Sequence, residues 1–438
     1  MNFQKARDYI RGLIRRGIKY ELSKIQRLTE LLGHPERQLR WVHITGTNGK
    51  GSTAATMAAL LRGQGHKVGL FTSPHLVSIR ERFRVDDDDA NEEDFVNIVK
   101  ELKPAIEQME GEETGAPTFF EICTAGACIH FLQKGVDVAI AEVGLGGKLD
   151  ATNIIMPEMT IITNIGWDHP KTLGPSYEQI CEQKCGIIKK EIPLLCGITQ
   201  PNLREMVKKT CAEKEAPLHW LEDEVKVENI ALDQDKGTSF DLTVIKSGET
   251  HRLTTPLHGA HQTSNAAIAI AASRLLPEDL RPAPGNWNRG LAHTRWEGRF
   301  QIYDKEPLVI MDGGHNVDGM KTLVKTWQGL FKNRKAQIVA GFSGDKAVPK
   351  ILNMLKPFTE RFIFTKSENY RAAEPNRLLE LAGEMEESPP HIAIDHPGKA
   401  LKEARQAAGA DGIVLVTGSL YLLGAVMACE RGLDGRGI

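Results

Sequence analysis

The chain has 438 residues, which is long for one hydrophobic core, so two domains are the better expectation. Hydrophobic residues make up 41% and charged residues 26%, and no apolar run approaches the roughly 18 residues of a membrane span. A net charge of −2 argues against nucleic acid as a partner. The N-terminus has no apolar segment typical of a secretory signal, and the seven cysteines lack paired zinc spacing, so we expect a cytoplasmic protein.

Predicted strands and helices alternate through the first part of the chain. Residues 4 to 32 have the spacing of two amphipathic helices, broken near Gly17. The predicted strands that follow cover residues 42–45, 67–72, 136–143, 160–165 and 193–196, and the predicted helices cover 53–62, 119–133 and 177–189. This alternation predicts a doubly wound, largely parallel α/β sheet. Short polar–apolar alternations over 225–253 predict a small antiparallel addition, and an Ala-rich helix follows over 261–276.

A second α/β unit is predicted in the last third of the chain. Its four apolar strands cover residues 308–311, 337–340, 361–365 and 412–416, with helices between them. This pattern predicts a smaller Rossmann-like domain. We place the domain boundary after Trp296, which divides the chain into residues 1–296 and 297–438.

The stretch from Trp41 to Ser52 combines a short apolar strand, a glycine loop with a lysine, and the start of a helix. Gly46, Gly49 and Gly51 let backbone N–H groups turn toward an anion, the helix N-terminus adds partial positive charge, and Lys50 adds a full one. The natural ligand of such a loop is a nucleotide polyphosphate. The glycine spacing departs from the commonest P-loop pattern, and a glycine turn with a solvated lysine is the alternative.

Polar residues follow several predicted strands at the sheet edge where ligands bind in open α/β proteins. Glu142 ends one apolar strand and is well placed to hold Mg²⁺ near phosphates at Lys50, the alternative being an exposed strand-end acid. Asp168 and His169 follow a second strand, and Ser73 follows a third. Separately, Cys181 and Cys185 lie four residues apart on one helix face. A metal or redox role is the less expected reading of this pair, because cysteine is more often a small buried hydrophobic residue.

The glycine loop resembles the ATP loop of the folylpolyglutamate synthase and dihydrofolate synthase branch of the Mur ligase superfamily. Further motifs similar to that family's occur in its order, between residues 45 and 419. They are Thr72-Ser-Pro-His-Leu76, Glu142-Val-Gly-Leu-Gly-Gly-Lys-Leu-Asp-Ala-Thr-Asn153, Asp168-His169, Lys184-Cys-Gly-Ile-Ile188, His261-Gln262 with Asn265-Ala266, Gly298-Arg-Phe300, Asp312-Gly-Gly-His-Asn316 and Thr417-Gly-Ser419. One such motif is weak evidence, but the ordered set is highly specific.

The resemblance implies an ATP-binding central domain that also holds the folate, a C-terminal domain that completes the site, and two Mg²⁺ ions. It implies four catalytic residues: Lys50, Glu142, His169 and Lys184. It implies a nucleotide site formed by Gly49, Lys50, Gly51, Ser52, Asn265, Arg299, Asp312 and His315. It implies substrate contacts at Ser73, Pro74, His75 and Arg82, and metal ligands Ser73, Glu142, His169 and Lys184. By pattern alone Lys184 would be a solvated helix lysine, whereas the resemblance implies that it carries a carbamate and binds the second metal.

The activity implied by the resemblance is the ATP-dependent addition of L-glutamate to a folate carboxylate through an acyl phosphate. The motifs are compatible with dihydropteroate, with reduced folates, or with both, and with a monomer that binds small molecules and no membrane. One alternative is a Mur-type ligase for a nucleotide-linked precursor, for whose UDP-binding domain the 45 residues before Gly46 are too few. The other is a P-loop switch, which as a GTPase would be expected to contain Asn-Lys-x-Asp, and this tetrapeptide does not occur.

Overall fold

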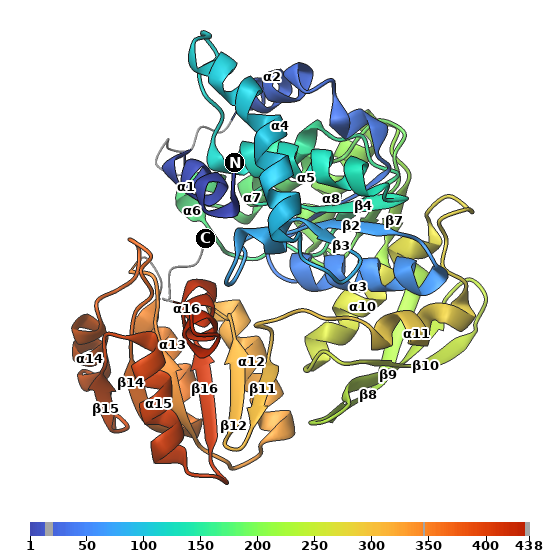
Figure 1. The fold of residues 1–438 in the computed structure, drawn as a ribbon. Helices are drawn as coiled ribbons and strands as arrows, with labels where there is room; N and C mark the ends of the chain where they lie inside the picture. The colour runs from blue at the N-terminus through green and yellow to red at the C-terminus, as the bar shows by residue number, and fades with distance from the viewer. Residues whose placement is uncertain (14–20, 345–346, 434–438) are drawn as a thin grey trace.

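The computed structural model describes residues 1–13, 21–344 and 347–433. The expected helix break near Gly17 lies outside these ranges. Within them, the helices are all too short or too polar to span a bilayer. The described chain contains three sheets. Helices pack on both faces of the two larger sheets and on one face of the smallest (Figure 1).

The largest sheet has seven strands in the order β3-β2-β4-β1-β5-β6-β7. The edge pair β2–β3 is antiparallel and the other pairs are parallel, as the alternation of strands and helices predicted. The strands are β1 Trp41–Thr45, β2 Val68–Phe71, β3 Arg84–Val85, β4 Val138–Glu142, β5 Met159–Ile162, β6 Leu194–Cys196 and β7 Leu218–Trp220. The sequence did not reveal β3 and β7, because these strands of two and three residues are half-exposed and lack the continuous apolar run of the equally short β6.

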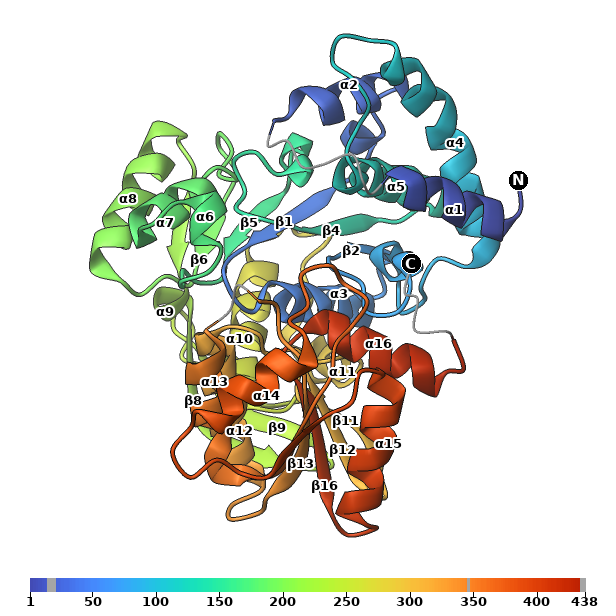
Figure 2. The same cartoon turned by 90° about the vertical axis from the view of Figure 1, so that its left-hand side faces the viewer.

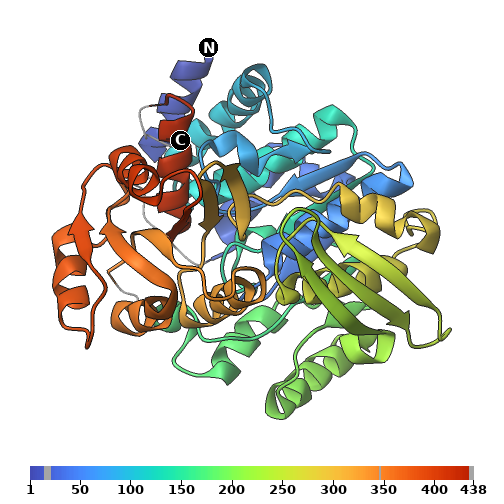
Figure 3. The same cartoon turned by 90° about the horizontal axis from the view of Figure 1, so that it is seen from below.

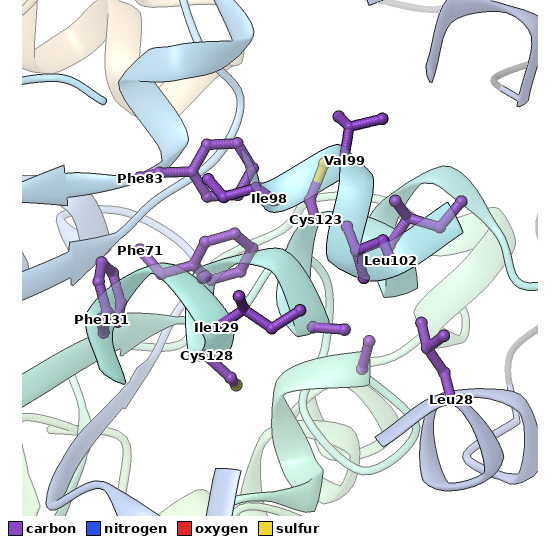
Figure 4. Close-up of a cluster of buried hydrophobic side chains, with 14 of the residues drawn as sticks. Leu28, Phe71, Phe83, Ile98, Val99, Leu102, Cys123, Cys128, Ile129 and Phe131 are labelled. Carbon is purple, nitrogen blue, oxygen red and sulfur yellow. The ribbon is translucent and has the colours of Figure 1, made fainter. Parts of the chain in front are cut away.

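Helices cover both faces of this sheet. Along β1, Trp41 packs into one hydrophobic cluster while Val42 and Ile44 pack into the other, as expected when successive side chains alternate between faces. The first face carries α1 Phe3–Leu13, α2 Ser23–Leu31, α4 Glu92–Glu110 and α5 Phe119–Lys134. Figure 4 shows part of this cluster, in which Phe71 of β2 and Phe131 of α5 lie near Phe83. The second face carries α3 Lys50–Gln64, α10 Ala260–Arg274 and α11 Trp287–Ala292.

Two helix ends differ from the sequence prediction by three residues or more. Helix α3 begins at Lys50 rather than residue 53, because Gly49 takes a left-handed conformation with φ 82° and starts the helix earlier. The helix predicted over 177–189 is α7, which ends at Cys185. Gly186 follows as the C-cap, and it lies against the backbone of Lys148, where any Cβ would collide. The remaining helices of the N-terminal part are α6 Pro170–Leu173, α8 Pro201–Glu213 and α9 Leu221–Glu224.

The predicted antiparallel addition is a three-stranded sheet in the order β10-β9-β8. Its strands are β8 Val225–Asp233, β9 Gly237–Val244 and β10 Thr250–Thr255. One face packs on α10 within the second hydrophobic cluster. Its β8–β9 turn lies beside the C-terminal part of the chain, where Asp235 pairs with Lys305 at 3.3 Å (Figure 3).

The C-terminal part contains a six-stranded sheet in the order β11-β12-β16-β13-β14-β15. Its strands are β11 Gln301–Lys305, β12 Leu308–Asp312, β13 Ala336–Ala340, β14 Thr359–Phe364, β15 His391–Ala393 and β16 Ile413–Thr417. One face carries α12 Val317–Leu330, α13 Val348–Leu355 and α14 Pro375–Gly383, and the other carries α15 Pro397–Ala408 and α16 Leu420–Glu430. The four predicted strands are present. The sequence missed β11 because it is a half-exposed, mixed edge strand, and β15 because it has three residues.

The two parts meet along the side of the large sheet that carries α3 and α10 (Figure 2). The loop after β2 reaches across this boundary, and Val77 is buried in a hydrophobic cluster of the C-terminal part. The described ranges also contain five 3₁₀ turns: Pro35–Gln38, Ile79–Arg82, Ala151–Ile154, Pro284–Asn286 and Lys356–Phe358.

Candidate active site

The carboxyl ends of β1, β2, β4 and β5 open onto a cavity of about 240 Å³ between the two parts of the chain. Most of the residues predicted from the sequence as site residues line it. They are Gly49, Lys50, Gly51, Ser52, Ser73, Pro74, Glu142, His169, Lys184, Asn265, Arg299, Asp312 and His315. His75 and Arg82 are the predicted site residues that do not line it.

The glycine loop between β1 and α3 forms one wall of the cavity. A Cβ at Gly46 would collide with Thr163, one at Gly49 with Asn265, and one at Gly51 with the Trp296 ring. Each glycine therefore allows an approach that a side chain would block. The N-terminus of α3 faces the cavity, and this combination suits a phosphate group.

Lys50 and Lys184 both reach the Gly46 carbonyl. Nζ of Lys50 donates to Gly46 O at 3.0 Å and to Thr47 O at 3.2 Å, and Nζ of Lys184 donates to Gly46 O at 2.8 Å. Lys184 is 3% exposed. Burial lowers the pKa of Lys184 well below its ordinary value, and the nearby Lys50 cation lowers it further.

The solvated position that the helix pattern alone indicated for Lys184 is therefore wrong. The physical reason is the close packing of α7 on the glycine-rich loop after β4. A Cβ on Gly147 would lie 2.9 Å from the carbonyl oxygen of Gln183, and Gly186 contacts Lys148 backbone to backbone. Two glycines thus bring the end of α7 close enough to bury Lys184 beside the nucleotide loop.

Glu142 lies at the end of β4 and is 4% exposed, so it is not an exposed strand-end acid. Its carboxylate accepts the backbone N–H of Ser73 at 3.2 Å. Burial raises the pKa of Glu142, while Lys50 and the Ser73 N–H oppose the rise. The Glu142 carboxylate and Ser73 hydroxyl are hard oxygen donors, which fit Mg²⁺. The described ranges contain no group of three or more His, Cys, Asp or Glu side chains that could hold a metal ion. The predicted ligand set does not require such a group, because only Glu142 and His169 among its members are of these four types.

Asp168 and His169 occupy the loop after β5. His169 has a left-handed backbone with φ 52° and precedes α6. Its backbone N–H donates to Asp168 Oδ1 at 3.0 Å, and its Nε2 lies 3.8 Å from Asp168 Oδ2. The ring is 42% exposed, toward a cavity that it lines.

The C-terminal part supplies the opposite wall. Asp312, at the end of β12, accepts the N–H groups of Phe300 at 2.9 Å and Gly314 at 2.8 Å. Burial raises the pKa of Asp312, and the Arg299 cation opposes the rise. His315 Nδ1 donates to the carbonyl of Gly313 at 2.9 Å. Asp312 and His315 thus both line the cavity, and these hydrogen bonds hold their side chains to the loop backbone.

His75 and Arg82 contact each other in the loop after β2. Arg82 Nε donates to His75 Nδ1 at 2.9 Å, and its guanidinium lies over the Phe119 ring, 5.3 Å from the centroid. Burial lowers the pKa of His75 well below its usual value. The sequence assigned no role to several motif residues that do line the cavity, namely Asn48, Asp168, His261, Gln262 and Asn316. Their place within the motifs was the feature of the sequence that could have marked them as site residues.

Cys181 and Cys185 lie in the hydrophobic cluster between α7 and α8, with their sulfur atoms 3.8 Å apart. Both are buried with a free thiol. Their position agrees with the simpler expectation of small buried hydrophobic residues.

Two segments of the chain match known protein families, and these matches define the class of protein. The Mur ligase middle domain family matches residues 44–273, and the Mur ligase glutamate ligase domain family matches residues 298–420. A two-part α/β fold with a glycine-loop cavity between the parts is therefore that of a Mur ligase.

Full-length relatives narrow the class. A dihydrofolate synthase/folylpolyglutamate synthase of Bacillus subtilis is 34% identical, over 96% of this chain and 97% of the relative. The crystal structure of a Thermotoga maritima folylpolyglutamate synthase matches with a TM-score of 0.85 and 30% identity, covering 100% of this chain and 98% of that one. E. coli FolC in complex with DHPP and ADP matches with a TM-score of 0.84 and 30% identity, covering 99% and 98%. The chain belongs to the folylpolyglutamate synthase/dihydrofolate synthase family of Mur ligases.

Proposed function

We propose that this chain joins L-glutamate to the carboxylate of a folate, with ATP as the source of chemical activation. The observation that carries the proposal is the cavity between the two parts, where the glycine loop and Lys50 face Asp312 and His315. The family supports the same reaction class, an ATP-dependent ligase, and the E. coli relative was solved with DHPP and ADP. Dihydropteroate and reduced folates are both candidate acceptors.

The residues present fit a nucleotide triphosphate. Lys50 and the N–H groups at the start of α3 would hold its phosphates. Arg299, Asp312 and His315 would hold the rest from the opposite wall, together with Asn265 of α10 beside the glycine loop. When bound, ATP supplies the phosphoryl group that turns the folate carboxylate into an acyl phosphate open to attack by the glutamate amine. The two walls exclude water, which would otherwise hydrolyse that intermediate.

We further propose that Ser73, Glu142, His169 and a carbamylated Lys184 hold two Mg²⁺ ions. The metal would neutralise charge on the phosphoryl group during transfer. Carbamylation needs a neutral amine, and the lowered pKa of Lys184 favours that form. His75 and Arg82, fixed to each other beside the cavity, are our candidates for folate contacts together with Pro74.

The division after Trp296 remains our proposal for the domain boundary. It is supported by the six-stranded sheet starting at Gln301 and by the glutamate ligase domain match starting at residue 298. We also propose a cytoplasmic monomer. Its seven free thiols, six of them buried, suit a reducing compartment.

The test is ATP-dependent incorporation of labelled glutamate, with dihydropteroate and tetrahydrofolate compared as acceptors. We expect incorporation into at least one acceptor and a loss of orders of magnitude in Lys50→Ala. Exposed Lys208 of α8 gives a control variant, Lys208→Ala, that should keep full activity. Nucleotide turnover that ignores both folate and glutamate would instead favour a P-loop switch, and labelling of a nucleotide-linked precursor would favour another Mur ligase.

A further inference from the structure

Three motif residues without an assigned role meet where the two parts of the chain face each other. Asn316 follows β12 in the C-terminal part, and its Nδ2 donates to Asp168 Oδ2 at 3.3 Å and to Asn48 Oδ1 at 3.4 Å. Asp168 belongs to the loop after β5, and Asn48 to the glycine loop. One amide group of the C-terminal part therefore contacts both loops of the N-terminal part that would hold metal and nucleotide.

The N-terminal side of this junction is firmly held. The Asn48 carbonyl accepts the Thr163 hydroxyl at 2.7 Å and the Asn164 amide at 2.9 Å, and the Asn48 N–H donates to Asn164 Oδ1 at 3.0 Å. Asp168 Oδ1 accepts the His169 N–H. The backbone of Asn48 is thus fixed to the residues that follow β5, and Asn316 contacts the side chain that this backbone carries.

Asn316 also forms a hydrogen bond within the C-terminal part. Its Oδ1 accepts the Gly319 N–H at 2.7 Å and so caps the N-terminus of α12. Capping alone does not require an asparagine, because Ser or Asp would serve equally. The amide group is required only for the two bonds to Asp168 and Asn48.

We propose that Asn316 is a positioning residue that latches the C-terminal part onto the nucleotide loop through Asp168 and Asn48. Asp168 lies within 3.8 Å of His169 Nε2 and 3.9 Å of His315 Nε2, so the latch also sets the places of these two side chains. In this way the loop that carries Asp312 and His315 stands opposite Lys50 only while the latch is formed. The inference rests on the proposed function in taking the cavity as the nucleotide site.

The variant Asn316→Asp separates the latch from the helix cap. An aspartate retains the cap on α12, but it removes the donor to Asn48 Oδ1 and sets a carboxylate against the carboxylate of Asp168, so the contact with Asp168 becomes repulsive. We expect the affinity of the full-length protein for the non-hydrolysable analogue AMPPCP, measured by calorimetry, to fall about tenfold or more. The melting temperature should equal that of the control variant described below, within experimental error.

The matched control is Asn91→Asp, which makes the same change at the exposed N-cap of α4, where Asn91 accepts the Asp94 N–H at 2.8 Å. It should bind AMPPCP like the wild type. The swap Asn316→Asp with Asp168→Asn restores a donor opposite an acceptor, so it should bind the analogue more tightly than Asn316→Asp alone. A role in capping α12 alone would not produce this rescue, because the cap is a bond to Gly319 and does not involve residue 168.

Two results would overturn the latch: wild-type affinity in Asn316→Asp, or a swap variant that binds no better than the single variant. Binding of AMPPCP requires neither folate nor glutamate. A chain that failed to ligate glutamate to folate would therefore contradict the proposed function in the incorporation assay. The ranking of the three variants would still decide on the latch.

Discussion

Lys50 and Lys184 share one acceptor, the carbonyl of Gly46, although they lie on different helices. Two unit charges at about 4 Å repel by roughly 4 kcal/mol at an effective dielectric near 20. Burial of Lys184 acts in the same direction, so both effects favour its neutral amine. The neutral amine is the nucleophile that attacks the carbon of carbon dioxide and then loses a proton to give the carbamate. The carbamate formed would be an anionic oxygen ligand beside Glu142 instead of a cation that repels metal.

Lys184→Ala should therefore be nearly inactive in glutamate incorporation, with partial rescue by a short carboxylate such as acetate. Bicarbonate should reactivate wild-type protein from which carbon dioxide has been removed. Lys189→Ala is the matched control, because burial also lowers the pKa of Lys189, to about 8, yet this residue does not line the cavity. The control should keep its activity with or without acetate. A Lys184→Ala variant that acetate does not rescue, together with bicarbonate-independent wild-type activity, would refute the carbamate.

His43 of β1 gives a pH-dependent prediction. Burial lowers the pKa of His43 to about 3, and its Nε2 contacts Thr152 Oγ1 at 2.8 Å. The unfolded chain takes up this proton near pH 6.5 and the folded chain does not, so the stability present above pH 6.5 is lost as pH falls toward 3. One such histidine removes about 1.4 kcal/mol of unfolding free energy per pH unit.

Urea unfolding between about pH 6 and 4 measures this loss. His43→Gln, whose amide can still meet Thr152, should lose stability less steeply with falling pH than the wild type, by about one proton. Equal slopes in the two proteins would show that His43 is not the group that titrates.

Among the secondary-structure elements, the contact between α16 and the loop after β2 joins the two parts of the chain. Val77 is buried among α16 residues, and the Glu81 carboxylate accepts the N–H groups of Leu76 at 2.6 Å and Val77 at 2.8 Å. Gly424 of α16 leaves space for the Leu76 backbone, with which any Cβ would collide. The same loop begins at Ser73 in the cavity, so its docking on α16 and the position of Ser73 are coupled.

Gly424→Ala should destabilise the protein by about 1–3 kcal/mol in urea unfolding and raise KM for the folate substrate. A loss of stability would point to the contact with Leu76, because a glycine-to-alanine change in an uncrowded helix raises the unfolding free energy by up to about 1 kcal/mol. Gly12→Ala in α1, where a Cβ meets nothing within 4 Å, is the control and should be neutral or stabilising. A stabilised Gly424→Ala with unchanged KM would disprove the coupling.

Over the whole molecule, the cavity belongs to neither part alone. Its lining comes from the glycine loop and the strand ends of the large sheet on one side and from Arg299, Asp312 and His315 on the other. A site divided in this way is complete only when the parts are together, which is also the condition that keeps water from a reactive acyl phosphate.

A chain ending at Trp296 should therefore bind ATP weakly and form no amide. Circular dichroism and a cooperative melting transition would establish that the shortened chain is folded. Glutamate incorporation by residues 1–296 at the full-length rate would contradict the division of labour between the two parts.

Local patterns in the sequence were enough to predict much of this protein. The glycine loop before α3, the alternation of strands and helices, and carboxylates at strand ends such as Glu142 and Asp312 are encoded by residues next to one another. For the same reason the strands β3, β7, β11 and β15 were missed, since short or half-exposed edge strands carry little periodic signal.

Tertiary structure alone decided the features that depend on residues far apart in the chain. Lys184 is buried because Gly147 and Gly186 allow two backbones to touch, and no helix pattern contains that contact. Asn316 meets Asp168 and Asn48 across 148 and 268 residues. Side-chain periodicity records which face of an element is buried but not which distant element covers it. The sequence by itself therefore determined most of the elements and the chemistry of their ends, and packing determined which of those ends face one another.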